Sequence, residues 1–377
     1  MNTHRSWIEI DLDVFRNNIR LIKKAIEPKK FCLPIKSNAY GHGLIEIGKV
    51  AEEEKVDYLA VASVSEGVIL RNEGIKLPIL VLGAFQKEEI VDFLNYNLDL
   101  TISSLFKASL VNEVLKETNQ IARVQLKVDT GMRRIGARPD TALTIYHEIK
   151  NSKKMQLTGV YSHLAIAEEK DHPFNQIQID LFQHFLNKVD TSNLCIHLSN
   201  SSACINRNLA FENMVRPGLL TFGCNPNQNE LIEGLRSFFT LKSKVSYFKV
   251  IEKGEGVSYG HTYISNRRTR IVTIPIGYGD GYLRALSNKG SVLIRGRKYP
   301  IVGAICMDQL MVDIQDGEAY VGDEVVLIGK QKNEEISILE VANQAMTIPY
   351  EILCHFNERL PRIYVSSSKT ISVIESP

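Results

Sequence analysis

The chain has 377 residues, of which 44% are apolar and 23% charged. At roughly 150 residues per domain it has room for two or three domains, each with its own core. This composition excludes a disordered chain and a small disulfide-stapled module. The 45 Lys and Arg residues nearly balance the 43 Asp and Glu residues, giving a net charge of +2, so nucleic acid is not an expected partner.

The first half of the chain alternates between short apolar runs and amphipathic segments of helical period. A helix comes first: Asp11 or Asp13 is suited to cap it, and its apolar face contains Phe15, Ile19, Leu21, Ile22 and Ile26. Eight strand-like runs follow, at residues 31–36, 58–63, 78–84, 98–103, 123–129, 157–164, 194–200 and 213–218. Eight βα units of this length predict a TIM barrel.

After about residue 236 the helical period largely disappears, and strand-like runs separated by glycine-bearing turns take its place. These runs lie at 244–251, 270–277, 291–296, 299–306, 309–314 and 324–329, and one short helix is expected around 337–345. We therefore expect an α/β protein, with a TIM (β/α)8 barrel over residues 1–235 and a mostly-β domain over residues 236–377.

The cysteines and the N-terminus bear on the compartment. The six cysteines include no CxxC pair, which argues against a disulfide framework or a zinc site, and no metal is expected; they are Cys32, Cys195, Cys204, Cys224, Cys306 and Cys354. The opening MNTHRSWIEIDL has no apolar signal segment, and stretches such as 77–85 are too short to span a membrane. We expect a cytoplasmic protein without membrane contact.

Polar residues end several of the predicted barrel strands. In a TIM barrel the active site forms at these carboxyl ends, and phosphate groups are commonly held after strands seven and eight. A single charged residue there is usually a solvated loop residue, but five of the eight strands end in this way. The residues are Lys36, Lys127 with Asp129, His163, the run Ser199, Asn200 and Ser201, and Arg216 before Gly218.

Lys36 is the most informative of them. It follows an apolar strand and precedes SNAYGHG, whose glycines let other groups approach closely. A partly desolvated lysine has a lowered pKa and can form a Schiff base with pyridoxal phosphate or a carbonyl substrate. The alternative is a surface lysine at the barrel rim, and position alone does not separate the two.

Six sequence blocks carry a resemblance to a known family. They are KSNAYGHG (36–43), VDTGMRRIG (128–136), MVRPG (214–218), VSYGHTY (257–263), IPIGYGDGY (274–282) and ICMDQ (305–309). Together they resemble the alanine racemases, fold-type III pyridoxal-phosphate enzymes. The resemblance extends from WIEIDL at 7–12 to ERLPRIY at 358–364, nearly the whole chain, and it implies the same barrel and β domain.

The resemblance implies pyridoxal 5'-phosphate as cofactor, with Lys36 bound to its aldehyde. Lys36 and Tyr259 are the two implied catalytic bases. Further cofactor contacts are implied for Tyr40, Arg134, His163, Asn200, Ser201, Arg216, Gly218, Leu219 and Tyr350. On the substrate side it implies Arg134, Tyr278, Met307 and Asp308, and Lys127 matches a lysine that is often carbamylated to hold the arginine.

The implied roles agree with the chemistry of racemisation. The α-proton leaves one face and a proton returns to the other, which one base cannot do, whereas a lysine and a tyrosine on opposite faces can. Arg216, implied to face the pyridine nitrogen, cannot give up a proton, so that nitrogen stays unprotonated and transamination is suppressed. Taken singly, His163 is also a typical core histidine, and Tyr259, Tyr278 and Met307 are also typical packing residues.

Several positions depart from the family pattern, namely Arg133, Phe222 and the pair Leu198 and Ser199. Arg133 replaces the glycine that is usual before the functional arginine. Either Arg133 or Arg134 can therefore turn towards the cofactor, and the family spacing favours Arg134.

The expected activity is the interconversion of L-alanine and D-alanine, which supplies D-alanine for peptidoglycan. A broader racemase acting on serine or dibasic amino acids is an open alternative. A related decarboxylase is disfavoured by Arg216, since an acidic residue is expected at the pyridine nitrogen there. A non-catalytic cofactor carrier built as a lone barrel has no use for residues 236–377.

The resemblance also implies a homodimer in which Tyr259 and Met307 complete the partner's site.

Overall fold

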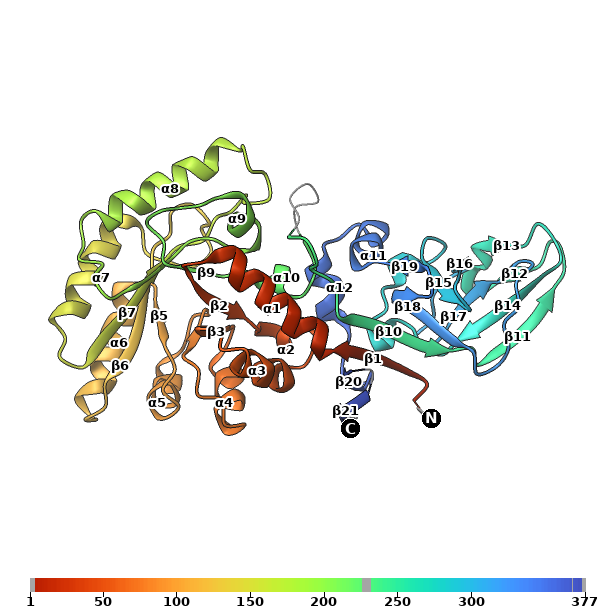
Figure 1. Cartoon of the computed structure of the whole chain (residues 1–377), viewed down its shortest axis with the longest axis horizontal. Helices are drawn as coiled ribbons and strands as arrows, with labels where there is room; N and C mark the ends of the chain where they lie inside the picture. Colours follow the sequence, from red (N-terminus) through yellow and green to blue (C-terminus); the bar gives the residue numbers. More distant parts are fainter. Residues whose placement is uncertain (1–3, 226–231, 368, 375–377) are drawn as a thin grey trace. The chain divides into compact units, whose positions relative to one another are not determined.

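The computed structural model describes residues 4–225, 232–367 and 369–374 (Figure 1). Contacts divide the chain into two compact units. The barrel unit comprises Arg16–Ala39 and Gly43–Arg236, and the β unit comprises Met1–Phe15, Tyr40–His42 and Ser237–Pro377. The division expected at residues 235 and 236 stays a prediction, and the contact units differ from it by assigning the N-terminal segment to the β unit.

Each of the eight expected barrel runs overlaps one strand of the barrel unit. The strands are β2 (Lys30–Pro34), β3 (Tyr58–Val61), β4 (Ile79–Val81), β5 (Leu100–Ile102), β6 (Ala122–Lys127), β7 (Met155–Tyr161), β8 (Cys195–His197) and β9 (Met214–Val215). All pair in parallel, in the orders β4-β3-β2-β9 and β5-β6-β7-β8.

Two contacts join these four-stranded sheets into a closed ring. A parallel bridge between Leu80 and Asp99 connects β4 to the start of β5. On the other side, the Asn213 N–H donates to Ile196 O at 3.1 Å, between β8 and β9. The predicted TIM barrel is confirmed, and all carboxyl ends of its strands lie at one rim.

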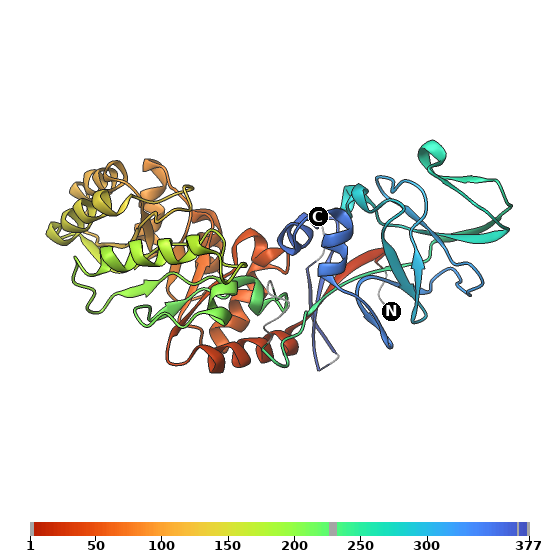
Figure 2. The same ribbon diagram turned by 90° about the horizontal axis from the view of Figure 1, so that it is seen from above.

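Helices cover the outside of the barrel strands, as Figures 1 and 2 show from two directions. They are α3 (Leu44–Glu53), α4 (Val64–Asn72), η1 (Lys87–Glu89), α5 (Ile90–Asn95), α6 (Leu105–Lys116), α7 (Pro139–Asn151), α8 (Pro173–Leu186), α9 (Ser201–Asn206) and α10 (Gly218–Thr221). Ser63 and Ser104 begin α4 and α6 as side-chain caps.

The predicted N-terminal helix is α1 (Leu12–Ile26). Asp11 caps it: its Oδ1 accepts the N–H of Asp13 at 3.0 Å and that of Val14 at 3.1 Å. The expected apolar face is buried at Phe15, Ile19, Ile22 and Ile26, and half-buried at Leu21.

The β unit contains an eight-stranded sheet in the order β16-β15-β18-β10-β1-β20-β21, with β19 paired to β18. Beside it are a three-stranded sheet, β11-β14-β17, and the pair β12-β13. The bounds are β1 (Ser6–Asp11), β10 (Phe239–Lys244), β11 (Tyr247–Ile251), β12 (Gly256–Val257), β13 (Tyr263–Ile264), β14 (Thr269–Ile274), β15 (Ser291–Ile294), β16 (Arg297–Pro300), β17 (Leu310–Asp313), β18 (Glu324–Gln331), β19 (Glu334–Ile336), β20 (Arg362–Ser366) and β21 (Lys369–Ile374).

Several elements of the β unit differ from the expectation. The segment 6–11, expected only to precede a helix, is strand β1, antiparallel to β10 and parallel to β20. The run 299–306 is a strand only as far as Pro300. The expected helix is α11 (Ile338–Ala345), and a second helix, α12 (Pro349–His355), follows it. Short 3-10 turns are η2 (Tyr259–His261), η3 (Tyr278–Asp280) and η4 (Arg284–Leu286).

All six cysteines carry free thiols. Burial raises the pKa of the Cys32 and Cys224 thiols to about 12, far above the value that gives a reactive thiolate. Among the helices of the described ranges, none combines the length and the apolar character that a membrane span needs.

Candidate active site

Strand β2 leads into Lys36, whose side chain is half-buried. The segment that follows, α2 (Lys36–Tyr40), is a left-handed turn, because Ser37–Tyr40 all have φ between 51° and 55°. Left-handed backbone costs roughly 1–2 kcal/mol for each non-glycine residue. Such a turn persists only where surrounding contacts hold it.

Some of the holding contacts lie within the same loop. The Ala39 N–H donates to Ile35 O at 2.9 Å, and the Gly43 N–H donates to Asn38 O at 2.9 Å. The Asn38 side chain also accepts the N–H of Leu44 at 2.8 Å, at the start of α3. The residues between Lys36 and α3 are therefore held in part by their own backbone and by one amide side chain.

Lys127 ends β6 and is almost fully buried, with 5% of its surface exposed. Burial first, and then the charges of Arg216, Arg134 and Lys36, together lower the pKa of its ammonium group to about 7. The Nζ atom lies 5.1 Å from the centre of the Tyr161 ring. At neutral pH a large fraction of Lys127 is thus an uncharged amine.

Arg133 and Arg134 differ in backbone and in electrostatic effect. Arg133 has a φ of 58°, in the left-handed region that glycine adopts without strain. A glycine, which the resemblance implies at that position, is suited to this backbone. The charge of Arg134 contributes to the lowered pKa of Lys127 and of His163. The electrostatics therefore favour Arg134 as the arginine on the side of Lys127.

Arg216 follows β9 and is 4% exposed. Its Nη2 donates to Ser162 O at 2.8 Å and to Leu198 O at 3.0 Å, and lies 3.3 Å from His163 Nδ1. Its Nη1 lies 2.5 Å from His197 Nδ1. A guanidinium held by so many acceptors in a buried place has one fixed orientation.

These contacts determine the state of His197. A guanidinium only donates, so His197 Nδ1 accepts, and Nε2 carries the proton that reaches Gln125 Oε1 at 2.8 Å. Burial first, then the charge of Arg216, places the pKa of His197 well below its ordinary value. The ring also stacks on Tyr161 with centres 4.7 Å apart. His197 is therefore neutral and positions Arg216.

The polar contacts continue into the barrel interior. Gln125 Nε2 donates to Asp99 Oδ2 at 3.3 Å, and Asp99 pairs with Arg123 Nε at 2.6 Å. Sequence reasoning missed Asp99, Gln125 and His197, although polar residues inside otherwise apolar strands were a signal for them. His163, which the sequence did single out, is half-buried, and burial with the charges of Arg216 and Lys127 places its pKa well below the ordinary value.

The loops after β8 and β9 meet at Ser201. Its Oγ accepts the N–H of Leu220 at 3.2 Å. Asn200 caps α9 by accepting the Ala203 N–H at 3.1 Å, and the Gly218 N–H donates to Arg216 O at 2.9 Å. The hydrogen bond between Ser201 and Leu220 thus joins the loop after β8 to the loop after β9.

Other predicted site residues lie in the β unit. Tyr40 is buried, and its ring centre lies 5.9 Å from that of Tyr350 in α12. Tyr259, in η2, is 73% exposed. The residue before it, Ser258, has a φ of 63°, and its Oγ donates to Ala304 O at 2.6 Å. This bond fixes the turn that presents the Tyr259 phenol.

Tyr278 and Met307 lie on two loops joined backbone to backbone. The Tyr278 N–H donates to Cys306 O at 3.1 Å, and the Gly279 N–H donates to Met307 O at 2.8 Å. Gly277 has to be glycine, because a Cβ there would lie 2.2 Å from Cys306 O. Tyr278 and Met307 are 43% and 54% exposed.

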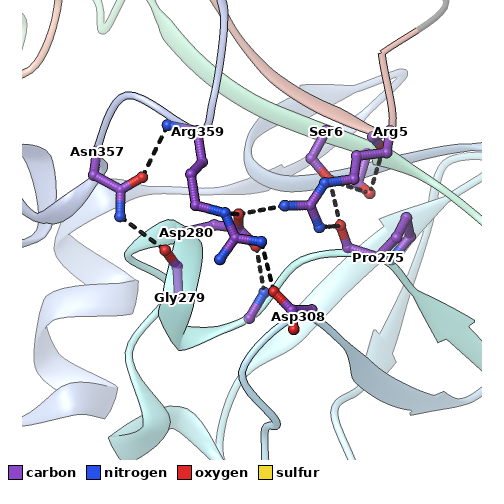
Figure 3. A network of polar contacts seen from close by, with 10 residues as sticks. Arg5, Ser6, Pro275, Gly279, Asp280, Asp308, Asn357 and Arg359 are labelled. Atoms are coloured by element: carbon purple, nitrogen blue, oxygen red, sulfur yellow. Dashed lines mark hydrogen bonds and ion pairs between the residues drawn. The ribbon is translucent and has the colours of Figure 1, made fainter. Parts of the chain in front are cut away.

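A charged network below these loops includes Asp308 (Figure 3). Asp280 is fully buried and pairs with Arg5 Nη2 at 2.6 Å and with Arg359 Nε at 3.3 Å. Arg359 Nη2 reaches Asp308 Oδ1 at 2.5 Å. One arginine therefore links the two loops that carry Tyr278, Met307 and Asp308.

Comparison with known proteins agrees with this architecture. One family model, described as the alanine racemase N-terminal domain, matches residues 10–226, and another, the alanine racemase C-terminal domain, matches residues 238–364. The chain belongs to the alanine racemase family. Enzymes of this family depend on pyridoxal phosphate.

Individual relatives within the alanine racemase family match over nearly full length. The chain is 39% identical to an alanine racemase of Halothermothrix orenii, covering 96% of this chain and 97% of that one. It is 37% identical to an alanine racemase of Methanococcus maripaludis, covering 97% and 100%. Among solved structures, an alanine racemase of Clostridium difficile 630 superposes with a TM-score of 0.93 at 36% identity, covering all of both chains.

Proposed function

We propose that this chain catalyses the pyridoxal-phosphate-dependent interconversion of L-alanine and D-alanine. The observation that carries the proposal is a cluster of cationic side chains at the carboxyl ends of the barrel strands. Lys36, Lys127, Arg134 and Arg216 interact electrostatically there, and Asp129 is the carboxylate that opposes their effect on Lys127. Such a cluster suits an anionic ligand bound beside a lysine amine.

The residues present fit the phosphate, the phenolic oxygen and the ring of pyridoxal phosphate. Lys36 supplies the amine, Ser201 with Asn200 and the backbone at Gly218 and Leu219 supplies polar groups for a phosphate, and Arg134 supplies a donor for the phenolic oxygen. The full set we propose is Lys36, Tyr40, Arg134, His163, Asn200, Ser201, Arg216, Gly218, Leu219 and Tyr350. When bound, the cofactor supplies an electron sink that acidifies the α-proton of the amino acid.

Arg216 sets the strength of that sink. Its guanidinium is held by Ser162 O and Leu198 O and by a neutral His197. Because it only donates, a pyridine nitrogen facing it accepts a hydrogen bond and stays unprotonated. This arrangement favours return of the proton to the α-carbon over transamination.

We assign the two proton transfers to Lys36 Nζ and Tyr259 Oη. Each group serves one face of the amino acid, and each returns the proton for the direction in which the other removes it. Tyr278, Met307 and Asp308 are proposed to contact the substrate together with Arg134. The loop contacts of Tyr278 and Met307 support this role, because they hold the Met307 backbone in one position.

We further propose a homodimer with shared active sites. Tyr259 and Met307 are 73% and 54% exposed in the single chain. A general base and a substrate-binding loop so open to water need a second surface to exclude it. In the dimer the two residues complete the site of the partner subunit.

Lys127 is proposed to carry a carbamate. The neutral amine attacks CO2, an N–C bond forms, one C=O π bond opens to a carboxylate, and one proton is released to water. The lowered pKa of Lys127 supplies the neutral amine near pH 7. The carbamate oxygens accept hydrogen bonds from Arg134 and place a negative charge among three cations, where the free amine has none.

The physiological role proposed is supply of D-alanine for peptidoglycan in the cytoplasm. Free thiols throughout the chain are compatible with a reducing compartment. Broader specificity is tested by offering L-serine and L-lysine beside L-alanine and following the product enantiomer.

A single experiment tests the central assignment. The purified protein is expected to show the visible absorption of bound pyridoxal phosphate. Borohydride reduction followed by peptide mapping should find the label on Lys36. A chain with no bound chromophore after addition of the cofactor contradicts the proposal.

A further inference from the structure

Glu66, in the first turn of α4, reaches across to the loop that follows β2. Its Oε1 accepts the N–H of Ser37 at 2.6 Å and lies 3.4 Å from the N of Asn38. Its Oε2 accepts the N–H of Ala62 at 2.8 Å. One half-buried carboxylate thus connects the loops after two neighbouring barrel strands, beside Lys36.

Ordinary helix capping does not account for these contacts. Ser63 and Glu66 have the spacing of a capping box, and Ser63 Oγ accepts the Glu66 N–H at 3.4 Å. In a capping box the glutamate returns to the N–H of the capping residue, as Glu89 does to the Gln86 N–H at 2.6 Å. Glu66 instead binds the residue before the cap and the loop of another strand. The contacts of its side chain therefore stabilise backbone outside α4.

The contact to Ser37 stabilises the left-handed turn at residues 37–40. Ser37 is the first of four consecutive residues with φ between 51° and 55°, and the Ser37 N–H belongs to the peptide that joins it to Lys36. Without an acceptor for this N–H, the peptide is free to rotate towards the less strained right-handed or extended backbone. A turn that relaxes in this way no longer fixes the backbone at Lys36, so the amine loses its single location.

We propose that Glu66 is a positioning residue for Lys36, holding the strained turn so that the amine has one location. The inference rests on the proposed role of Lys36 as cofactor lysine and base. A reacting group has to be held within about 0.5 Å of its productive place. A displacement of about 1 Å lowers the rate by about 100-fold, so a contact to the neighbouring peptide acts on catalysis without touching the substrate.

The test compares three variants of the cofactor-loaded enzyme with the wild type. Glu66→Ala removes both acceptors, and Glu66→Gln keeps one acceptor oxygen but directs an NH2 group at the second N–H. Glu89→Gln is the matched control, since it alters a glutamate in the same helical position whose acceptor contact is its own capping residue. Measurements are kcat, KM, thermal melting, cofactor absorption during dialysis, and amide hydrogen exchange by mass spectrometry.

We expect Glu66→Ala to lower kcat by about 10- to 100-fold, with a smaller change in KM. Glu66→Gln should fall between it and the wild type, and Glu89→Gln should keep wild-type kcat. Amide exchange should accelerate in peptides covering 35–44 and stay unchanged in the other barrel strands. Bound cofactor should also be lost faster on dialysis than from the control.

Other results overturn the inference. These are a kcat within about twofold of wild type for both Glu66 variants, or exchange that accelerates throughout the barrel in Glu66→Gln. If Glu66→Ala does not fold, Glu66→Gln decides between the outcomes. A wild-type chain without racemase activity would contradict the proposed function instead, while the exchange of peptides 35–44 would still report whether Glu66 holds the turn.

Discussion

The titration of Lys127 leads to a prediction about stability. Its pKa is about 7 in the folded chain against 10.5 for an ordinary lysine, because the ammonium is buried beside Arg216, Arg134 and Lys36. Between these values the unfolded chain binds a proton that the folded chain has released. The free energy of unfolding therefore rises with pH in this window and is flat below pH 7, where both states carry the charge.

The magnitude follows from the two pKa values. If the whole difference between the two pKa values is used, the contribution of Lys127 to the free energy of unfolding increases by about 2 kcal/mol between pH 7 and pH 9. Lys127→Met removes the titration and keeps an unbranched chain of similar length in the buried site. The free energy of unfolding of the wild type, relative to that of the variant, should therefore rise by about 2 kcal/mol from pH 7 to pH 9.

The assay is urea unfolding of both chains at pH 7, 8 and 9, with saturating cofactor and buffers purged of CO2. Adding bicarbonate at pH 8 should stabilise the wild type alone, because a carbamate forms only on the lysine. Unfolding free energies that change in parallel for the two chains from pH 7 to pH 9 would refute the reasoning, since Lys127 would then stay charged in the folded protein.

Three further predictions concern the bases. Lys36→Ala should abolish racemisation while circular dichroism and melting temperature stay near wild type, and an unfolded variant would make Lys36 structural. Mixed Lys36→Ala and Tyr259→Phe chains should recover up to about one quarter of wild-type activity, since half of randomly formed dimers contain one intact site; no recovery despite demonstrated subunit exchange would place both bases in one chain. In deuterated water Tyr259→Phe should still exchange the α-proton of D-alanine while exchange into L-alanine and net racemisation fall by ~100-fold; equal residual exchange in both enantiomers, measured by NMR, would contradict a face-specific Tyr259.

The barrel was predictable from sequence because its strands are short apolar runs that alternate with amphipathic segments of helical period. Strand β1 was not, because its partners β10 and β20 lie far along the chain. The run 299–306 shows the opposite error. Val302 and Ile305 are buried in irregular backbone, so apolar character alone indicated a strand that is absent after Pro300.

The candidate site divides in the same way. Strand-end residues such as Lys127 and Arg216 follow from position in a barrel. Glu66 and His197 do not, because their importance lies in which backbone and side-chain atoms they contact after folding. Glu66, three residues after Ser63, has the spacing of a capping box. In the structure its side chain instead binds the backbone N–H groups of Ser37 and Ala62.

The placement of β1 has a consequence for how the protein is made. Its residues Trp7, Ile8 and Ile10 are buried in the centre of the eight-stranded sheet. They are synthesised before the barrel sequence, whereas β10 is synthesised only after it and β20 later still. The apolar strand β1 therefore stays unpaired at both edges while the rest of the chain is synthesised. Unpaired strand edges can form hydrogen bonds with other nascent chains and promote aggregation. A circular permutant that moves the segment 1–11 behind residue 377 would give β1 its partners at once, at the cost of separating it from the helix that Asp11 caps.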